Sequence, residues 1–179
     1  RAAGAGRRST VVNEVILGMS GTTWALMGAA FAAIGGGIGS SIGITTISNT
    51  AAGIVTEDAE KFGRVLPLAA MPGTQGIYGL ITAILVLSFF GFLGGTEPAI
   101  TADTGVKIFL ACLPVAAVCL VSAVYQGMTA VGAAGMVARR SEDAGKALIF
   151  PALVETYAVF SLIATIIMLS RIAALYPVG

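Results

Sequence analysis

Four long apolar segments constrain the fold of this chain more than any other feature. They cover roughly residues 21–55, 65–95, 106–138 and 147–175. Each is long enough to cross about 30 Å of hydrocarbon, and short polar stretches separate them. Because backbone polar groups cannot remain unpaired in lipid, such segments are expected to be helices. The sequence therefore predicts an all-α membrane protein with four transmembrane helices.

The composition supports this class of protein and excludes others. Apolar residues make up 56% of the chain and charged residues only 11%, whereas a soluble domain carries about 25% charged residues. The net charge of +1 gives no electrostatic footprint for nucleic acid. The chain has no histidine, the commonest metal ligand and usual general base. Cys112 and Cys119 are interpreted as small buried residues on one helix face, too far apart to form a disulfide.

The chain contains an internal repeat. Shifting the sequence by 82 residues aligns AAGIV with AAGMV and, without a gap, LITAILVLS with LIATIIMLS. A repeat of this kind predicts two tandem helical hairpins in parallel orientation. We expect a basic N-terminal tail over residues 1–18, a first hairpin over residues 19–95 and a second hairpin over residues 96–179.

The distribution of positive charge bears on orientation in the membrane. With four spans, both chain ends lie on the same side. The polar loops at 56–64 and 138–146 together carry five lysine and arginine residues. The positive-inside rule favours a cytoplasmic location for these loops if the basic tail is discounted. The tail itself is expected to be poorly ordered or a short surface segment, and we assign it no role.

The first apolar segment has glycines at four-residue spacing, at Gly35, Gly39 and Gly43. Small residues at this spacing let helix backbones approach closely in lipid. The pattern suits the tightly curved inner wall of an oligomer, and it equally suits packing of this helix inside its own bundle.

One carboxylate, Glu155, is the only formal charge between residues 147 and 170. A charge at the centre of a bilayer is costly, and such residues mark ion paths, proton relays or ion pairs. No lysine or arginine lies in the middle of another apolar segment. Glu155 must therefore be protonated, bound to a cation, or paired with a residue of another protein.

Uncharged oxygen donors occur at a similar depth in two other segments. The repeat register aligns Glu155 with Gly73, which directly precedes Thr74 and Gln75, and the third segment contributes Gln126. Buried amides and hydroxyls need partners in lipid, and a hard cation binds oxygen ligands. One carboxylate with several neutral oxygens forms a neutral complex with a monovalent cation, whereas calcium would leave a net positive charge.

Two neighbouring residues add to this pattern. Pro72 lacks an N–H and so frees the carbonyl of Leu68, and the adjacent glycine lets the helix open, so that the Met71 carbonyl can turn toward a site. Tyr78 lies one turn beyond Thr74 on the same helix face. Its hydroxyl is placed either to hydrogen-bond the carboxylate or to serve as an interfacial or packing group.

These motifs resemble the membrane rotor subunit (the proteolipid c or K subunit) of V-type and A-type rotary ATPases, especially the sodium-carrying bacterial members. The resemblance covers about residues 20–175. It rests on the glycine-rich first helix, PGTQGIYG in the second, YQG in the third and LVETYA in the fourth. It implies that Na⁺ is carried by Glu155, Thr74, Gln75, Gln126 and the backbone carbonyl of Met71, where the family usually has leucine, with Tyr78 bonding the carboxylate.

The resemblance also implies partners and a location. Identical copies form a ring in a bacterial plasma membrane, surrounded by lipid, that turns against a stator membrane subunit with an ion-path arginine. Central-stalk subunits bind at the cytoplasmic loops. ATP is hydrolysed elsewhere in such a complex, and the chain has no GxxxxGK[ST] motif, so it is no enzyme on its own. Three alternatives stay open: the same rotor carrying protons, a small secondary cation transporter, and a structural proteolipid.

Overall fold

The computed structural model describes residues 15–95 and 98–177. Within these ranges, four helical stretches are long and apolar enough to cross a membrane. They are Gly21–Glu57, Ala59–Phe89, Ala102–Arg139 and Ser141–Leu175. The predicted fold class, an all-α membrane protein with four spans, is therefore confirmed.

The odd-numbered spans are single helices and the even-numbered spans are interrupted. Helix α2 covers Gly21–Glu57 and helix α5 covers Ala102–Arg139. The second span consists of the 3₁₀ turn η1 (Ala59–Lys61), α3 (Phe62–Ala70), the 3₁₀ turn η2 (Met71–Gly73) and α4 (Thr74–Phe89). The fourth consists of η3 (Ser141–Asp143), α6 (Ala144–Ala147) and α7 (Ile149–Leu175).

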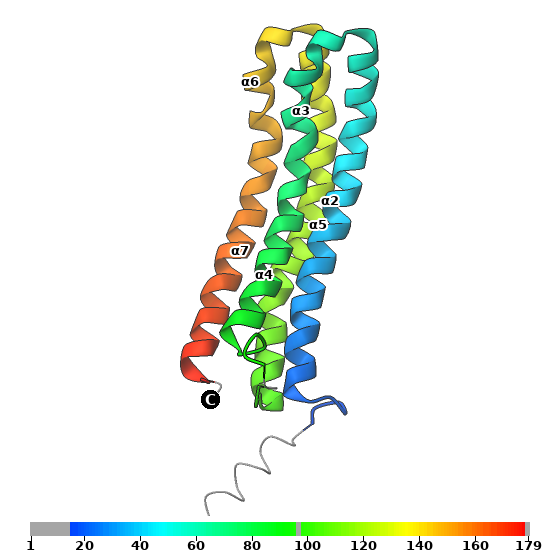
Figure 1. Cartoon of the computed structure of the whole chain (residues 1–179). Helices are drawn as coiled ribbons and strands as arrows, with labels where there is room; N and C mark the ends of the chain where they lie inside the picture. Colours follow the sequence, from blue (N-terminus) through cyan, green and yellow to red (C-terminus); the bar gives the residue numbers. More distant parts are fainter. Residues whose placement is uncertain (1–14, 96–97, 178–179) are drawn as a thin grey trace, which may run out of the picture.

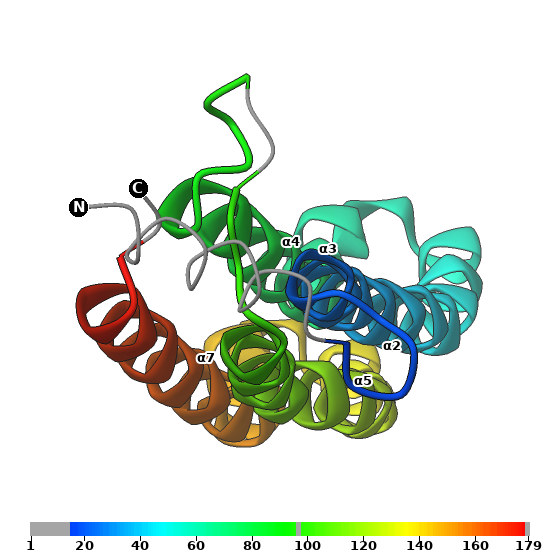
Figure 2. The same cartoon turned by 90° about the horizontal axis from the view of Figure 1, so that it is seen from below.

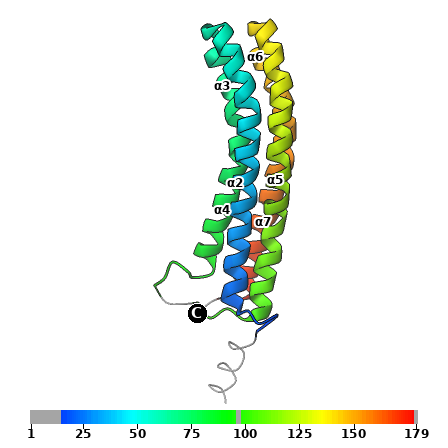
Figure 3. The ribbon, with the colours of Figure 1, turned by 90° about the vertical axis from the view of Figure 1, so that its right-hand side faces the viewer.

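The four spans form one long bundle of two antiparallel hairpins (Figure 1). The turns η1 and η3 lie at the same end, and the start of α2 and the end of α7 lie at the opposite end. Figure 2 shows the helices grouped around a common axis, and Figure 3 shows the gentle bend that they share. The most extensive packing joins α2 of the first hairpin to α5 of the second.

The spaced glycines of α2 explain this close packing. A Cβ atom on Gly35, Gly39 or Gly43 would overlap backbone atoms of α5, at Ala116, Leu120 and Ala123 respectively. Because glycine has no side chain, the backbones of α2 and α5 can touch at these positions. Of the two interpretations of the glycine pattern, packing inside the chain's own bundle is therefore observed.

The second span ends earlier than its hydropathy predicts. We expected it to reach residue 95, but α4 ends at Phe89, and Gly91 follows with a φ of 78°. The Phe92 N–H donates to the Leu87 carbonyl at 3.0 Å, which is the 6→1 bond of a Schellman motif. A glycine in the left-handed conformation thus stops the helix although the apolar sequence continues.

Only the end of the predicted basic tail can be compared with the structure, because residues 1–14 lie outside the described ranges. Ile16 and Met19 pair through two backbone hydrogen bonds of 3.1 Å and form a turn. The Trp24 indole nitrogen donates to the Ile16 carbonyl at 3.2 Å, so this turn is fastened to the start of α2.

The buried apolar residues form two clusters with polar residues between them. One cluster fills the half of the bundle near the start of α2 and includes Cys112 and Cys119, which are buried and unbonded as predicted. The other surrounds Ile47 and Leu68 in the half near the hairpin turns. Between the clusters lie fully or almost fully buried polar side chains: Ser40, Gln75, Ser122 and Gln126.

Candidate ion-binding site

The break between α3 and α4 places three oxygen atoms together. At η2 the backbone changes to 3₁₀ geometry, with Pro72 at its centre, and the Thr74 N–H bonds to the Met71 carbonyl. The Thr74 hydroxyl donates to the same carbonyl at 2.9 Å and lies 3.3 Å from the Gln75 side-chain oxygen. A backbone carbonyl, a hydroxyl and an amide oxygen thus lie within one turn.

Helix α2 holds this break in place from the inside of the bundle. A Cβ on Gly43 would lie 2.7 Å from the Pro72 ring, so only glycine lets α2 approach η2 this closely. The Ser40 hydroxyl accepts a hydrogen bond of 2.8 Å from the Gly76 N–H in the first turn of α4. First-turn N–H groups have no acceptor within their own helix. Ser40 therefore caps α4 from a neighbouring helix and fixes where its first turn begins.

Helix α5 contributes two polar side chains, Ser122 and Gln126, which lie one turn apart. Gln126 and Gln75 are both fully buried, and the Gln75 amide nitrogen donates to the Gln126 side-chain oxygen at 2.6 Å. The same nitrogen lies 3.2 Å from the hydroxyl of Ser122. The Gln126 amide nitrogen donates to the Pro151 carbonyl at 3.1 Å and to the Glu155 carboxylate at 3.3 Å.

Helix α7 contributes the carboxylate. Glu155 is half-buried, and its second oxygen accepts a hydrogen bond of 2.7 Å from the Tyr78 hydroxyl. The salt bridges in residues 15–95 and 98–177 join Lys61, Lys107 and Lys146 to aspartates near the helix ends, away from Glu155. Within the described ranges, the carboxylate is therefore held by neutral donors.

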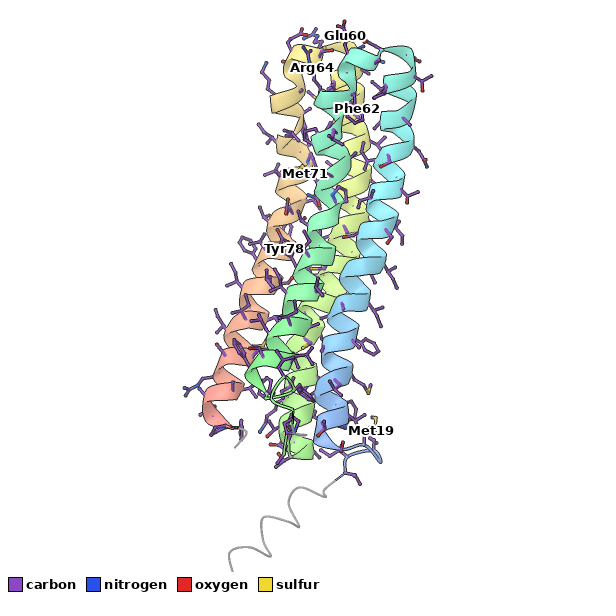
Figure 4. The ribbon with its side chains drawn as sticks, viewed as in Figure 1. Met19, Glu60, Phe62, Arg64, Met71 and Tyr78 are labelled. Carbon is purple, nitrogen blue, oxygen red and sulfur yellow. The ribbon has the colours of Figure 1, made fainter. Side chains whose placement is uncertain are left out.

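A continuous set of contacts links these groups across three helices. It runs from Thr74 through Gln75, Gln126 and Glu155 to Tyr78, which lies one turn from Thr74 on the same helix. Figure 4 labels Met71 and Tyr78, which lie about midway along the bundle, and Glu60 and Arg64 at one end. The groups therefore meet in the middle part of the bundle, away from the hairpin turns.

The chemistry of this group suits a monovalent cation. One carboxylate lies among uncharged oxygens, and no cluster of three His, Cys, Asp or Glu side chains occurs in the part of the chain that the structure describes. Hard cations bind carboxylate, carbonyl and hydroxyl oxygens. A single positive charge balances the site and avoids a net charge in lipid.

All six residues singled out from the sequence lie together, but sequence reasoning missed two serines. Ser122 lies four residues before Gln126 and so shares its face of α5. Ser40 is the counterpart of Ser122 in the repeat, because the two positions are 82 residues apart. This register and the helix spacing were the signals that could have identified both.

Comparison with known proteins agrees with the repeat. The model of the ATP synthase C subunit family matches residues 27–86 and again residues 109–168. The two matches are separated by the same 82 residues as the repeat in the sequence.

Two similar proteins cover most of the chain. It is 35% identical over 153 residues to the V-type sodium ATPase subunit K of Enterococcus hirae, which covers 86% of this chain and 94% of that protein. It is 37% identical over 159 residues to the A-type ATP synthase subunit K of Methanocaldococcus jannaschii, which covers 89% of this chain and 64% of that protein.

Proposed function

Because the chain belongs to the ATP synthase C subunit family, as a rotor proteolipid of the V and A types that forms rings within ATPase complexes, we propose that its cargo is Na⁺, bound at Glu155. The protein itself is a multi-pass membrane protein that translocates ions and does not hydrolyse ATP. Na⁺ transport by rotation coupled to ATP hydrolysis is the function that the site supports best.

The set of neutral oxygens beside Glu155 is the observation that carries this proposal. Na⁺ requires several oxygen ligands, here the side chains of Thr74, Gln75 and Gln126 and the Met71 carbonyl. A proton needs one acceptor and no such cage. Both carboxylate oxygens accept hydrogen bonds, from Tyr78 and Gln126, and these two contacts orient the carboxylate beside the neutral oxygens. The sodium-specific name of the Enterococcus hirae relative gives independent support.

In the proposed cycle, Glu155 exchanges one positive partner for another. Na⁺ enters from an aqueous half-channel at the stator and neutralises the carboxylate, so that the loaded site turns through lipid at low cost. When the ring brings the site to the arginine of the stator membrane protein, the guanidinium replaces Na⁺ as the counter-charge. The ion then leaves through the second half-channel.

The number of sites per chain fits a pump. One carboxylate serves four helices, because the repeat partner of Glu155 is Gly73. A ring of such chains carries fewer ions in each turn than a ring of the same size with one carboxylate in every hairpin. Fewer ions for each ATP allow transport against a steeper gradient. We place the hairpin turns on the cytoplasmic side, where the central-stalk subunits bind.

Carbodiimide labelling of Glu155 in the assembled ring tests the cargo. At fixed pH and ionic strength, Na⁺ is expected to slow the modification, measured by mass spectrometry, while potassium at the same concentration is not. Lowering the pH raises the Na⁺ concentration needed for half-protection, because protons compete for the same carboxylate. Labelling that is insensitive to Na⁺ at every pH contradicts the proposal and supports a rotor that carries protons.

A further inference from the structure

One side of the second hairpin carries an apolar groove that the described part of the chain leaves uncovered. Ala117, Val121 and Tyr125 follow one another at four-residue spacing on one face of α5 and are exposed, Val121 to 52%. Together with Val154 and Tyr157 of α7 they line a groove of about 490 Å³, which we call the α5–α7 groove. None of its lining residues is charged. In a membrane, such a groove is filled either by lipid or by an apolar face of another protein.

The repeat shows what fills the equivalent groove of the first hairpin. The counterparts of Ala117, Val121 and Tyr125, 82 residues earlier, are the spaced glycines of α2. Helix α5 packs on these glycines and also contacts α4, so it occupies the groove between α2 and α4. The repeat counterpart of α5 is α2. Because stacked repeats bury equivalent faces in equivalent ways, the α5–α7 groove is expected to receive an α2 helix. The chain's own α2 already packs on another face of α5, so this helix belongs to a second copy.

Helix α2 has an exposed stripe at the positions that this packing requires. Moved back by 82 residues, the three α5 positions that meet the glycines become Ile34, Ile38 and Ser41. All three are exposed, Ile38 to 50%. Their spacing of four and three residues places them on one face of α2, and we call them the α2 stripe. The face that α5 buries against the first hairpin is thus uncovered on α2.

The α2 stripe and the α5–α7 groove are complementary in the size of their side chains. By the repeat, Ile34 faces Ala117, a small residue of the groove. Ser41, the smallest residue of the stripe, faces the large side chain of Tyr125. Facing positions that pair a large side chain with a small one interdigitate well. Neither surface is charged, so the contact buries no unpaired charge.

We propose that α2 of one copy of the chain packs into the α5–α7 groove of the next copy, with Ile38 of the first against Val121 of the second. The contact joins two different surfaces, and head-to-tail contacts of this kind form a ring when the rotation closes. It repeats between copies the packing that joins the two hairpins within one chain. The inference concerns how the copies meet, and it holds whichever ion they carry.

Cysteine cross-linking in the whole complex tests this contact. A chain with both Ile38→Cys and Val121→Cys is treated with a mild oxidant in its membrane and run on a denaturing gel without reductant. Most of the monomer band is expected to shift to a ladder of dimers, trimers and larger species that reductant collapses, since a disulfide forms only between Cα atoms about 4.4–6.8 Å apart. A disulfide within one chain gives no ladder. Cys112 and Cys119 are buried, so the wild-type chain is expected to stay monomeric on the gel.

The matched control keeps Ile38→Cys and moves the second cysteine to position 163. Ile163 of α7 is 49% exposed, close to the value for Val121. Its repeat counterpart Ile81 remains exposed although the second hairpin packs beside the first, so Ile163 is expected to face lipid. The Ile38→Cys, Ile163→Cys chain is therefore expected to stay monomeric under the same oxidation.

The outcomes are independent of the proposed cargo, because the ladder is measured without reference to Na⁺ protection of Glu155. Should the first pair prevent assembly of the ring, Ile34→Cys with Ala117→Cys replaces it, since these positions face each other one turn along the same contact. An assembled ring that gives no ladder overturns the inference and indicates that lipid fills the groove. A ladder of equal yield from the control pair would also overturn it, because it would reflect random collision of the chains.

Discussion

The first and second hairpins share one repeat but contribute different chemistry to the site. In both, a threonine hydroxyl donates to the carbonyl three residues earlier, at 2.9 Å from Thr74 to Met71 and at 2.7 Å from Thr156 to Leu153. Thr74 is half-buried among other oxygens, whereas Thr156 is exposed on a continuous part of α7. The same local motif thus takes part in a site in one hairpin and faces outward in the other.

The carboxylate is present in the second hairpin and absent from the equivalent position of the first. Glu155 in the second hairpin corresponds to Gly73 in the first, and Gly73 belongs to the 3₁₀ turn that breaks the helix. The first hairpin supplies an opened backbone and neutral oxygens, and the second supplies the charge and the Gln126 amide. The repeat therefore builds one site from two unlike halves and leaves the chain with a single carboxylate at this depth.

The largest expected effect follows from removing the charge. Glu155→Gln is expected to abolish Na⁺-coupled transport, because an amide cannot neutralise the ion, while the ring still assembles, because the side chain keeps its shape. Uptake of radioactive Na⁺ into proteoliposomes that contain the whole complex measures the first effect, and ring mass in detergent measures the second. Retained transport would support the structural proteolipid interpretation.

A second prediction asks whether the charge can be moved to the other hairpin. In a chain that carries Glu155→Gln, adding Gly73→Glu is expected to leave transport abolished. A side chain at position 73 would point toward Ile44, whose Cδ1 lies 3.4 Å from the Cβ position, and Ile44 is the repeat counterpart of Gln126. The displaced carboxylate therefore lacks the amide that Glu155 has. Recovery of Na⁺ uptake in the double variant would show that the halves are interchangeable.

These contrasts mark the limit of what the sequence predicts. Hydropathy identified the four spans because bilayer thickness sets their length, and the repeat placed Glu155, Thr74 and Gln75 at one depth. The end of α4 was missed because backbone conformation at Gly91, and not polarity, stops the helix. Ser122 was missed because its hydrogen bond with the Gln75 amide depends on how the side chains of α4 and α5 pack.

The threonines at equivalent positions of the repeat, Thr74 and Thr156, give a third prediction. Its expected effect is intermediate in size. Thr74→Val replaces the hydroxyl by a methyl group and is expected to raise the half-protecting Na⁺ concentration about 10- to 100-fold, the range typical of a lost metal-site interaction. Thr156→Val makes the same change at the repeat-equivalent position and is expected to leave that concentration unchanged. Equal effects of the two substitutions would contradict the asymmetry between the hairpins.

The smallest effect is expected at Tyr78, which touches the carboxylate but is not expected to touch the ion. Tyr78→Phe removes the 2.7 Å hydrogen bond to Glu155. Hydrogen bonds to charged groups contribute about 1.5–3 kcal/mol, and the half-buried position favours the low end, so about tenfold weaker Na⁺ protection is expected. Tyr157→Phe, at a tyrosine that is 67% exposed, should have no effect. The second hairpin has Phe160 at the position equivalent to Tyr78, so it lacks the hydroxyl, and α7 is continuous where the first hairpin has the turn η2. An unchanged half-protecting concentration in Tyr78→Phe would mean that the geometry of Glu155 is set from α5 alone, through Gln126.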